Sequence, residues 1–355
     1  MANLKVNTVS GIGTEGTVFD GGLHFRSKNY LTLPKGTTTE RTATSSGIST
    51  ETGSIRYNTD SNKMECYVNN KWMIVATSSP NLDGGARGVI AGGQQPGTAS
   101  NIIQYVTIPS AGNAIDFGDL RETERQRPYG LASATRGILA GGRDHPSYWN
   151  SIDYITISSG GGSNDFGELA QGGWSGAGAS NNTRGLFIGG YLPDSTTIFA
   201  GTVRNFKKIQ FVEIASTGVN AGVFGELTEN GIRECGALAS PTRAVRLGGK
   251  TTTSAPSWGN TIGSIDFVTI ASAGDALDFG DLLSINAAGT ACSNSTRGIH
   301  AGGIPSGSSR SNIIQYITIA TLGNAQDFGD LIEVNCLQGA ASSDTRGIFA
   351  GGSQP

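Results

Sequence analysis

Two stretches of the sequence carry residue types that serve phosphate chemistry in other proteins. Residues 244–251, AVRLGGKT, fit the loose phosphate-loop pattern, with Ala244 in place of its first glycine. A phosphate loop lies between a strand and a helix, because backbone amides and the helix dipole must face the phosphate. The TTTSAPSWGN that follows, residues 251–260, has no helical pattern, so we expect no nucleotide site here.

The second stretch is the DFG at residues 116–118. In protein kinases it works with an HRD motif and a glycine-rich lid, and neither occurs in this sequence. The histidines are His24, His145 and His300, which lie far apart, and nothing in their order suggests a metal site or a serine–histidine–aspartate triad. The sequence therefore predicts a protein that is not an enzyme and that holds no cofactor and no metal.

Composition argues against several further classes of protein. The formal net charge is −3 and 15% of the residues are charged, so the chain lacks the basic footprint of a nucleic-acid-binding protein. No stretch approaches the roughly 18 apolar residues of a membrane-spanning helix, and the first residues lack the apolar core of a signal peptide. The four cysteines form no closely spaced pair, which favours reduced thiols. We expect a protein made in a cytoplasm, without membrane insertion.

One phrase, TRGxxxGG in its commonest spelling, recurs six times in the second part of the chain. A variable loop follows each of the first five copies, then an alternating apolar strand, a short turn and the motif D-F-G-[DE]-L or its variant VFGEL. The phrase lies at 86–93, 135–142, 183–190, 242–249, 296–303 and 345–352; the alternating strands at 101–108, 151–157, 208–214, 264–270 and 312–319; and the DFG motifs at 116–120, 165–169, 223–227, 278–282 and 327–331.

Four short strands in each unit of about fifty residues predict a fold of stacked β-sheets. The 54 glycines disfavour helices, and a repeat of this length with a double glycine after a strand is typical of kelch-type propeller blades. Residues 81–355 are thus predicted to form an all-β, kelch-like β-propeller. Five blades are favoured, with 338–352 completing the blade of 101–120 and 86–93 left over. Six blades, one of them incomplete, are the alternative.

Two features of the repeat suggest how the blades hold together. The phenylalanine of each DFG motif would wedge between neighbouring blades, and each TRG arginine could pair with the repeated Asp or Glu. The arginines are Arg87, Arg136, Arg184, Arg243, Arg297 and Arg346. At the fifth position of the phrase, Arg246 and His300 replace an apolar residue, either as a polar contact between blades or as a binding determinant.

Residues 1–80 do not repeat. Strand-like stretches lie at 21–27, 29–34 and 53–75, the last with turns at NTDSNK and NNK. A segment this polar buries little apolar surface alone, so we expect it to form a small β-rich region that oligomerises or attaches to another protein.

The loops after each double glycine are expected to gather on one rim, because they leave equivalent strands at the same end. These loops, at 94–100, 143–150, 191–206, 250–263 and 304–312, vary most within the repeat. Exposed aromatic rings offer flat apolar faces to sugars and proteins, although such rings can also fold back onto their own loops. The candidate binding residues are Tyr148, Trp149, Tyr191, Phe199, Phe206 and Trp258.

Parts of the sequence resemble virion proteins of tailed bacteriophages. GSIRYNTDSNKMECYVNNKWMIV, residues 53–75, resembles a hairpin common in tail-fibre proteins. The opening LKVNTVSGIG…VFDGGLHF…YLTLPKGTTTERT and the repeats resemble portions of virion proteins of marine phages, whose arrays are kelch-like. The resemblance implies a virion structural protein or adhesin, a homotrimer that attaches to other virion proteins through residues 1–80 and contacts a host surface glycan or protein. An intracellular kelch-type scaffold and a propeller enzyme are the alternatives.

Overall fold

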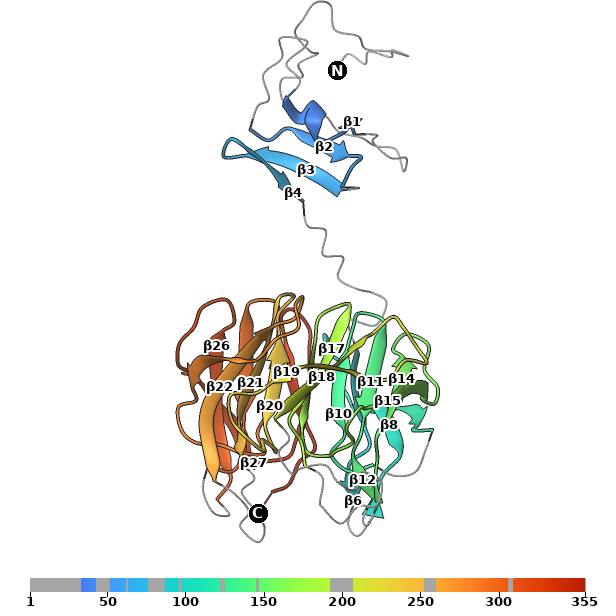
Figure 1. Ribbon diagram of the computed structural model, residues 1–355, viewed down its shortest axis with the longest axis vertical. Helices are drawn as coiled ribbons and strands as arrows, with labels where there is room; N and C mark the ends of the chain where they lie inside the picture. Colours follow the sequence, from blue (N-terminus) through green and yellow to red (C-terminus); the bar gives the residue numbers. More distant parts are fainter. Residues whose placement is uncertain are drawn as a thin grey trace, which may run out of the picture. The chain divides into compact units, whose positions relative to one another are not determined.

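The computed structural model of the protein describes residues 33–42, 52–61, 63–75, 87–95, 98–121, 125–144, 147–191, 207–251, 260–305 and 309–354. These residues form strands and one short 3₁₀ turn, with no α-helix among them (Figure 1). No helix in the described ranges is long and apolar enough to cross a membrane. The fold class is therefore all-β, as the composition predicted. The chain divides into two compact units, Met1–Ser79 and Pro80–Pro355, next to the expected boundary.

The first unit contains a four-stranded sheet in the order β1-β2-β3-β4. Asn69 and Asn70, both with positive φ, form the tight turn between β3 and β4, which is the hairpin turn predicted at NNK. The expected strand at 21–27 lies outside the described residues, and so do residues 29–32 of the strand expected at 29–34. Residues 33 and 34 are described and form no strand. The elements are β1 (Lys35–Gly36), the 3₁₀ turn η1 (Thr39–Thr42), β2 (Ile55–Asn58), β3 (Lys63–Val68) and β4 (Lys71–Ile74).

The second unit contains six successive antiparallel sheets, one for each copy of the repeated phrase. Figure 1 shows the labelled sheets side by side, from the sheet of β8 to the sheet of β26. Their strands are β5 (Arg87–Ala91), β8 (Ile102–Thr107) and β9 (Ile115–Asp119); β10 (Tyr129–Ala132), β11 (Arg136–Ala140), β14 (Ser151–Thr156) and β15 (Asn164–Glu168); β16 (Ala177–Ser180), β17 (Arg184–Ile188), β18 (Lys208–Glu213) and β19 (Gly222–Glu226); β20 (Gly236–Ala239), β21 (Arg243–Lys250), β22 (Thr261–Thr269) and β23 (Leu277–Asp281); β24 (Thr290–Ser293), β25 (Arg297–Ala301), β26 (Ser311–Thr318) and β27 (Gln326–Asn335); and β28 (Gly339–Ser342) with β29 (Gly347–Ala350).

Each four-stranded sheet has the strand order read from the repeat. The small-residue stretch forms the first strand, the TRG phrase the second, the alternating stretch the third and the DFG motif the fourth. The first strands need small residues because they pack closely: a Cβ added to Gly178 on β16 would come within 2.2 Å of the Gly130 carbonyl oxygen on β10. Two short hairpins, β6 (Gln94–Gln95) with β7 (Thr98–Ala99) and β12 (Arg143–Asp144) with β13 (Ser147–Tyr148), project after two of the double glycines.

Apolar side chains between the sheets form the core. Ile152, Leu186 and Ile265 are fully buried there. The predicted wedge is confirmed for Phe117, Phe166, Phe224 and Phe279, which are at most 6% exposed. Phe328 differs, because it is 50% exposed although its motif is the same.

The predicted pairing of TRG arginines with the Asp or Glu of the DFG motif is wrong. Arg136 instead donates from Nη1 to the carbonyl oxygens of Ile214 and Ala215, 2.8 and 3.0 Å away at the end of the next sheet's third strand. A guanidinium forms charge-assisted hydrogen bonds to backbone carbonyls, so these arginines need no carboxylate as a partner. Arg87, Arg184, Arg243 and Arg346 make the same two bonds to Ile157 and Ser158, Ile270 and Ala271, Ile319 and Ala320, and Ile108 and Pro109.

The expected clasp, in which 338–352 completes the blade of 101–120, is also wrong. β5 already pairs with β8 in the register Arg87↔Thr107, so residues 86–93 are not left over. β28 and β29 form a separate two-stranded sheet. This last sheet lies against the first one through side chains: a Cβ added to Gly88 would be 2.9 Å from the Cβ of Ala341.

Candidate functional site

The ends of the sheets at the double glycines are tied together by backbone hydrogen bonds. Both glycines have positive φ, 59° and 97° at Gly141 and Gly142, a conformation that strains other residues. The second glycine then donates its N–H to a carbonyl of the next sheet, as Gly142 does to Gly173 at 2.9 Å. Equivalent bonds run from Gly93 to Arg125, Gly190 to Ile232, Gly249 to Asn286 and Gly303 to Asn335.

Five residues just before the first strands form a second set of backbone bonds, which we call the inner arc. All five have positive φ between 48° and 64° although none is glycine. The N–H of each of the last four donates to the carbonyl of the equivalent residue in the preceding sheet, at 2.6 to 3.1 Å, so the arc runs across five successive sheets. Its members are Arg127, Ser175, Glu234, Ala288 and Leu337.

Side chains on three successive sheets meet at this end and form what we call the cation–aromatic patch. They come from the arc residues, from the residue before each arc residue and from the residue after each double glycine. The last two kinds of residue pair with each other as isolated β-bridges. On the next two sheets the same positions hold small or apolar residues and a serine. The patch comprises Arg127, Arg143, Trp174, Tyr191, Arg233, Glu234 and Lys250.

Glu234 is the carboxylate at the centre of the patch. It lies 3.3 Å from Nη1 of Arg127, 3.4 Å from Nη1 of Arg233 and 3.3 Å from Nζ of Lys250. Arg143 adds a fourth cation, so four positive charges stand against one negative charge among the described patch residues, an excess of three.

Two aromatic rings hold the cations in place. The guanidinium carbons of Arg143 and Arg127 lie 3.7 and 5.2 Å from the ring centroid of Trp174. The Trp174 and Tyr191 rings meet edge to face at 6.1 Å, and Arg233 lies 5.4 Å from the Tyr191 centroid. Such cation–ring contacts stabilise a charge that has lost part of its hydration.

The cations are only partly hydrated. The side chains of Arg127 and Lys250 are 31% and 21% exposed, and that of Arg233 is buried. Burial lowers the pKa of Arg127, with Arg143 and Arg233 adding to the effect and Glu234 opposing it. Beneath them, Nε1 of Trp174 is buried without a hydrogen-bond partner. Among the described residues, the partly exposed cations Arg127, Arg143 and Lys250 therefore outnumber the one carboxylate of the patch.

Three of the six predicted binding residues lie in the described ranges. Tyr191 belongs to the patch. Tyr148 pairs with Arg143 on the β12–β13 hairpin, and Trp149 follows it, with its N–H bonded to the carbonyl of Gly142. Both are half-buried, and the Nε1 of Trp149 is buried without a partner. Phe199, Phe206 and Trp258 lie outside the described residues.

Four residues of the patch were not predicted from the sequence: Arg127, Trp174, Arg233 and Glu234. They lie in the stretch that leads back to each TRG phrase, which reads as small and featureless. An alignment of the repeats would reveal them, because the pair of positions that one residue separates from each first strand reads QR, WS, RE, AA and CL.

The phosphate-loop stretch is part of β21, and its amides serve the fold: Gly249 and Lys250 donate to Asn286 and Arg233. No cluster of metal-binding side chains occurs among the residues that the structure describes. Arg246 and His300 are both 1% exposed, which excludes the binding role left open for them. Arg246 forms a buried ion pair with Asp266.

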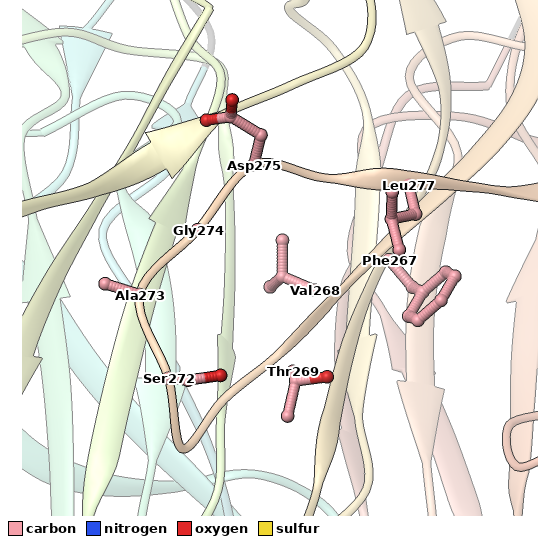
Figure 2. A pocket seen from close by; sticks show the side chains of 8 residues that line it. All are labelled: Phe267, Val268, Thr269, Ser272, Ala273, Gly274, Asp275 and Leu277. Atoms are coloured by element: carbon pink, nitrogen blue, oxygen red, sulfur yellow. The ribbon is translucent and has the colours of Figure 1, made fainter.

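A shallow pocket also lies at the turn between β22 and β23, lined by Phe267, Ser272, Asp275 and Leu277 among others (Figure 2). Its one carboxylate already accepts a hydrogen bond from the N–H of Glu226 at 2.9 Å. The other lining side chains are apolar or small, so this pocket carries no reactive or binding chemistry.

Comparison with protein-family models and with curated proteins found no match. The geometry of the patch is therefore what bears on function.

Proposed function

We propose that the chain is a non-enzymatic binding protein of a phage particle, and that its second unit is a six-bladed, kelch-like propeller. The repeated contacts support the propeller, because the same arginine–carbonyl bonds join sheets that are one repeat apart. The last sheet makes this bond to the first, through Arg346 and Ile108. The inner arc would then surround the propeller axis, and the cation–aromatic patch would lie on one rim.

The observation that carries the binding role is the concentration of the patch on three of the five sheets that contribute to the arc. Permanent cations and aromatic rings bind a partner without performing acid–base chemistry, since guanidinium and ammonium groups stay charged near neutral pH. A feature needed only for folding would recur on every sheet, as the TRG arginines nearly do.

The first unit supports attachment and trimer formation. One face of its sheet exposes apolar side chains: Met73 is 57% exposed, Ile55 46%, Val68 38% and Tyr57 37%. The opposite face carries the buried polar residues Arg56, Asn58 and Glu65. Apolar surface of this kind is typical of an interface between copies or with another virion protein.

The virion assignment rests on the resemblance of residues 53–75 and of the repeats to virion proteins of tailed bacteriophages. It is tested on purified phage particles. Mass spectrometry of purified phage should find the chain at a fixed ratio to the other structural proteins. Purified chain should also bind host cells, and Trp149→Ala and Trp258→Ala variants with unchanged circular dichroism should bind less. Absence of the chain from purified particles would refute the virion role, and an unchanged affinity in both variants would exclude the aromatic loops as the contact.

A further inference from the structure

We infer that the cation–aromatic patch is a binding site for an oxyanion group carried by a saccharide, a carboxylate, sulfate or phosphate on the surface glycan that the protein contacts. This inference rests on the proposed function for the glycan, and on the patch itself for the anion.

The described residues of the patch carry more positive than negative charge, which favours an anionic ligand. Burying a cation is costly unless an anion or a full set of hydrogen bonds compensates it, because the interior solvates charge less well than water does. Among the described residues, Glu234 is the carboxylate that pairs with both Arg127 and Lys250, and Arg143 is stacked on Trp174. An oxyanion ligand would supply the missing negative charge.

The arrangement of donors is the second argument. The more accessible cations are Arg127 and Lys250, which both pair with Glu234, and Arg143, which lies over the Trp174 ring. A guanidinium offers up to five N–H donors and an ammonium three, so Arg127 and Lys250 can each bind Glu234 and a second anion at once.

Shape favours a small charged group on a sugar over a long polyanion. The patch is confined to three sheets, and the chain as a whole carries a net charge of −3, which repels an extended polyanion. The half-buried ring of Tyr191 lies beside the cations, and an aromatic ring next to a charge suits a sugar ring that carries an acidic substituent.

The test measures direct binding of defined saccharides to the full chain at low and at physiological salt. The probes are an oligogalacturonate, a sulfated oligosaccharide, a phosphorylated oligosaccharide, inorganic phosphate, a neutral oligosaccharide of equal length and a polyglutamate peptide. We expect at least one acidic saccharide to bind saturably, the neutral one not to bind, and affinity to fall as salt rises. Preference among the acidic probes identifies the oxyanion.

Charge variants give the directional check. Lys250→Gln should weaken binding about fivefold, and Glu234→Gln should strengthen it by a similar factor because it removes the competing carboxylate. Lys208→Gln is the matched control, since Lys208 is an exposed lysine on β18 outside the patch, and it should change affinity less than about twofold. Thermal melts confirm that each variant is folded, and Arg143→Lys provides a second variant with the charge retained.

The outcomes separate the two proposals. No saturable binding by any acidic saccharide, equal effects of Lys250→Gln and Lys208→Gln, or tighter binding of polyglutamate than of every saccharide would overturn this inference. Cell binding by the chain without saccharide binding would leave the proposed function standing. Saccharide binding by a chain that is absent from particles would support the site and refute the virion role.

Discussion

The guanidinium of Arg346 lies 2.9 Å from the carbonyl oxygen of Ile108, although 238 residues separate the two in sequence. The same bond joins the sheets of Arg87, Arg136, Arg184 and Arg243 to the sheet that follows each of them in the chain. The contact therefore extends the repeat from the last sheet back to the first.

Arg346→Ala should destabilise the second unit by about 1–2 kcal/mol, because two charge-assisted bonds to backbone carbonyls are lost. Arg297→Ala is the control. Arg297 lies over the Tyr316 ring at 4.6 Å, but its guanidinium donates no hydrogen bond among the described residues. Its loss should cost less than about 0.5 kcal/mol by urea denaturation. Equal costs for the two variants would contradict the role given to Arg346.

Phe279→Ala should cost about 3–5 kcal/mol, since this ring is 2% exposed between two sheets and a cavity would remain. Phe328→Ala, at the equivalent position, should cost less than about 1 kcal/mol, because its ring is 50% exposed. The denaturation midpoints of the two variants measure this difference. A destabilisation by Phe328→Ala as large as that by Phe279→Ala would contradict the prediction.

Gly280→Ala should destabilise far more than Gly329→Ala. Both glycines have similar positive φ, 144° and 138°, so the conformational penalty for alanine is shared. A Cβ on Gly280 would meet the backbone of Gly323 at 2.6 Å, whereas a Cβ on Gly329 meets nothing within 4 Å. We expect about 1 kcal/mol for Gly329→Ala and several for Gly280→Ala. Similar melting temperatures would show that the close approach of the sheets is dispensable.

The buried His300 should make stability depend on pH. Burial lowers its pKa to about 4, below the value of roughly 6.5 expected in the unfolded chain. Between these values the unfolded chain takes up a proton that the folded chain does not, so stability is full above pH 6.5 and falls as the pH drops toward 4. From pH 7 to pH 5 the loss should be about 2 kcal/mol.

A His300→Gln variant serves as the reference for this effect. It removes the titrating group, so its free energy of unfolding should change about 2 kcal/mol less between pH 7 and pH 5 than that of the parent. Parallel pH profiles for the two proteins would mean that the imidazole takes up its proton in the folded state as well.

Much of the second unit could be read from the sequence, because its repeats expose the strand pattern. The TRG, alternating and DFG stretches all form strands near the predicted positions. The partners of the TRG arginines could not be read, since the acceptors are backbone carbonyls that any residue supplies. The predicted clasp was wrong for a related reason. Residues 86–93 and 345–352 have the same sequence pattern, so the pattern does not show that β5 is the strand that pairs with β8.

The candidate site was only partly predictable. Tyr191 was named because aromatic residues in variable loops attract notice. Arg127 and Glu234 went unnoticed, because 107 residues separate them in sequence and only the stacking of the sheets brings them together.

The neighbouring sheets are joined near the double glycines by peptide groups, through Gly142 and its equivalents and through the inner arc. Peptide groups are the same whatever side chain a residue carries. The positions that read QR, WS, RE, AA and CL can therefore be exchanged with little effect on how the sheets fit together. Under the proposed binding role, such a surface can change its ligand while its framework stays unaltered, so related chains with new specificities should differ first at these pairs.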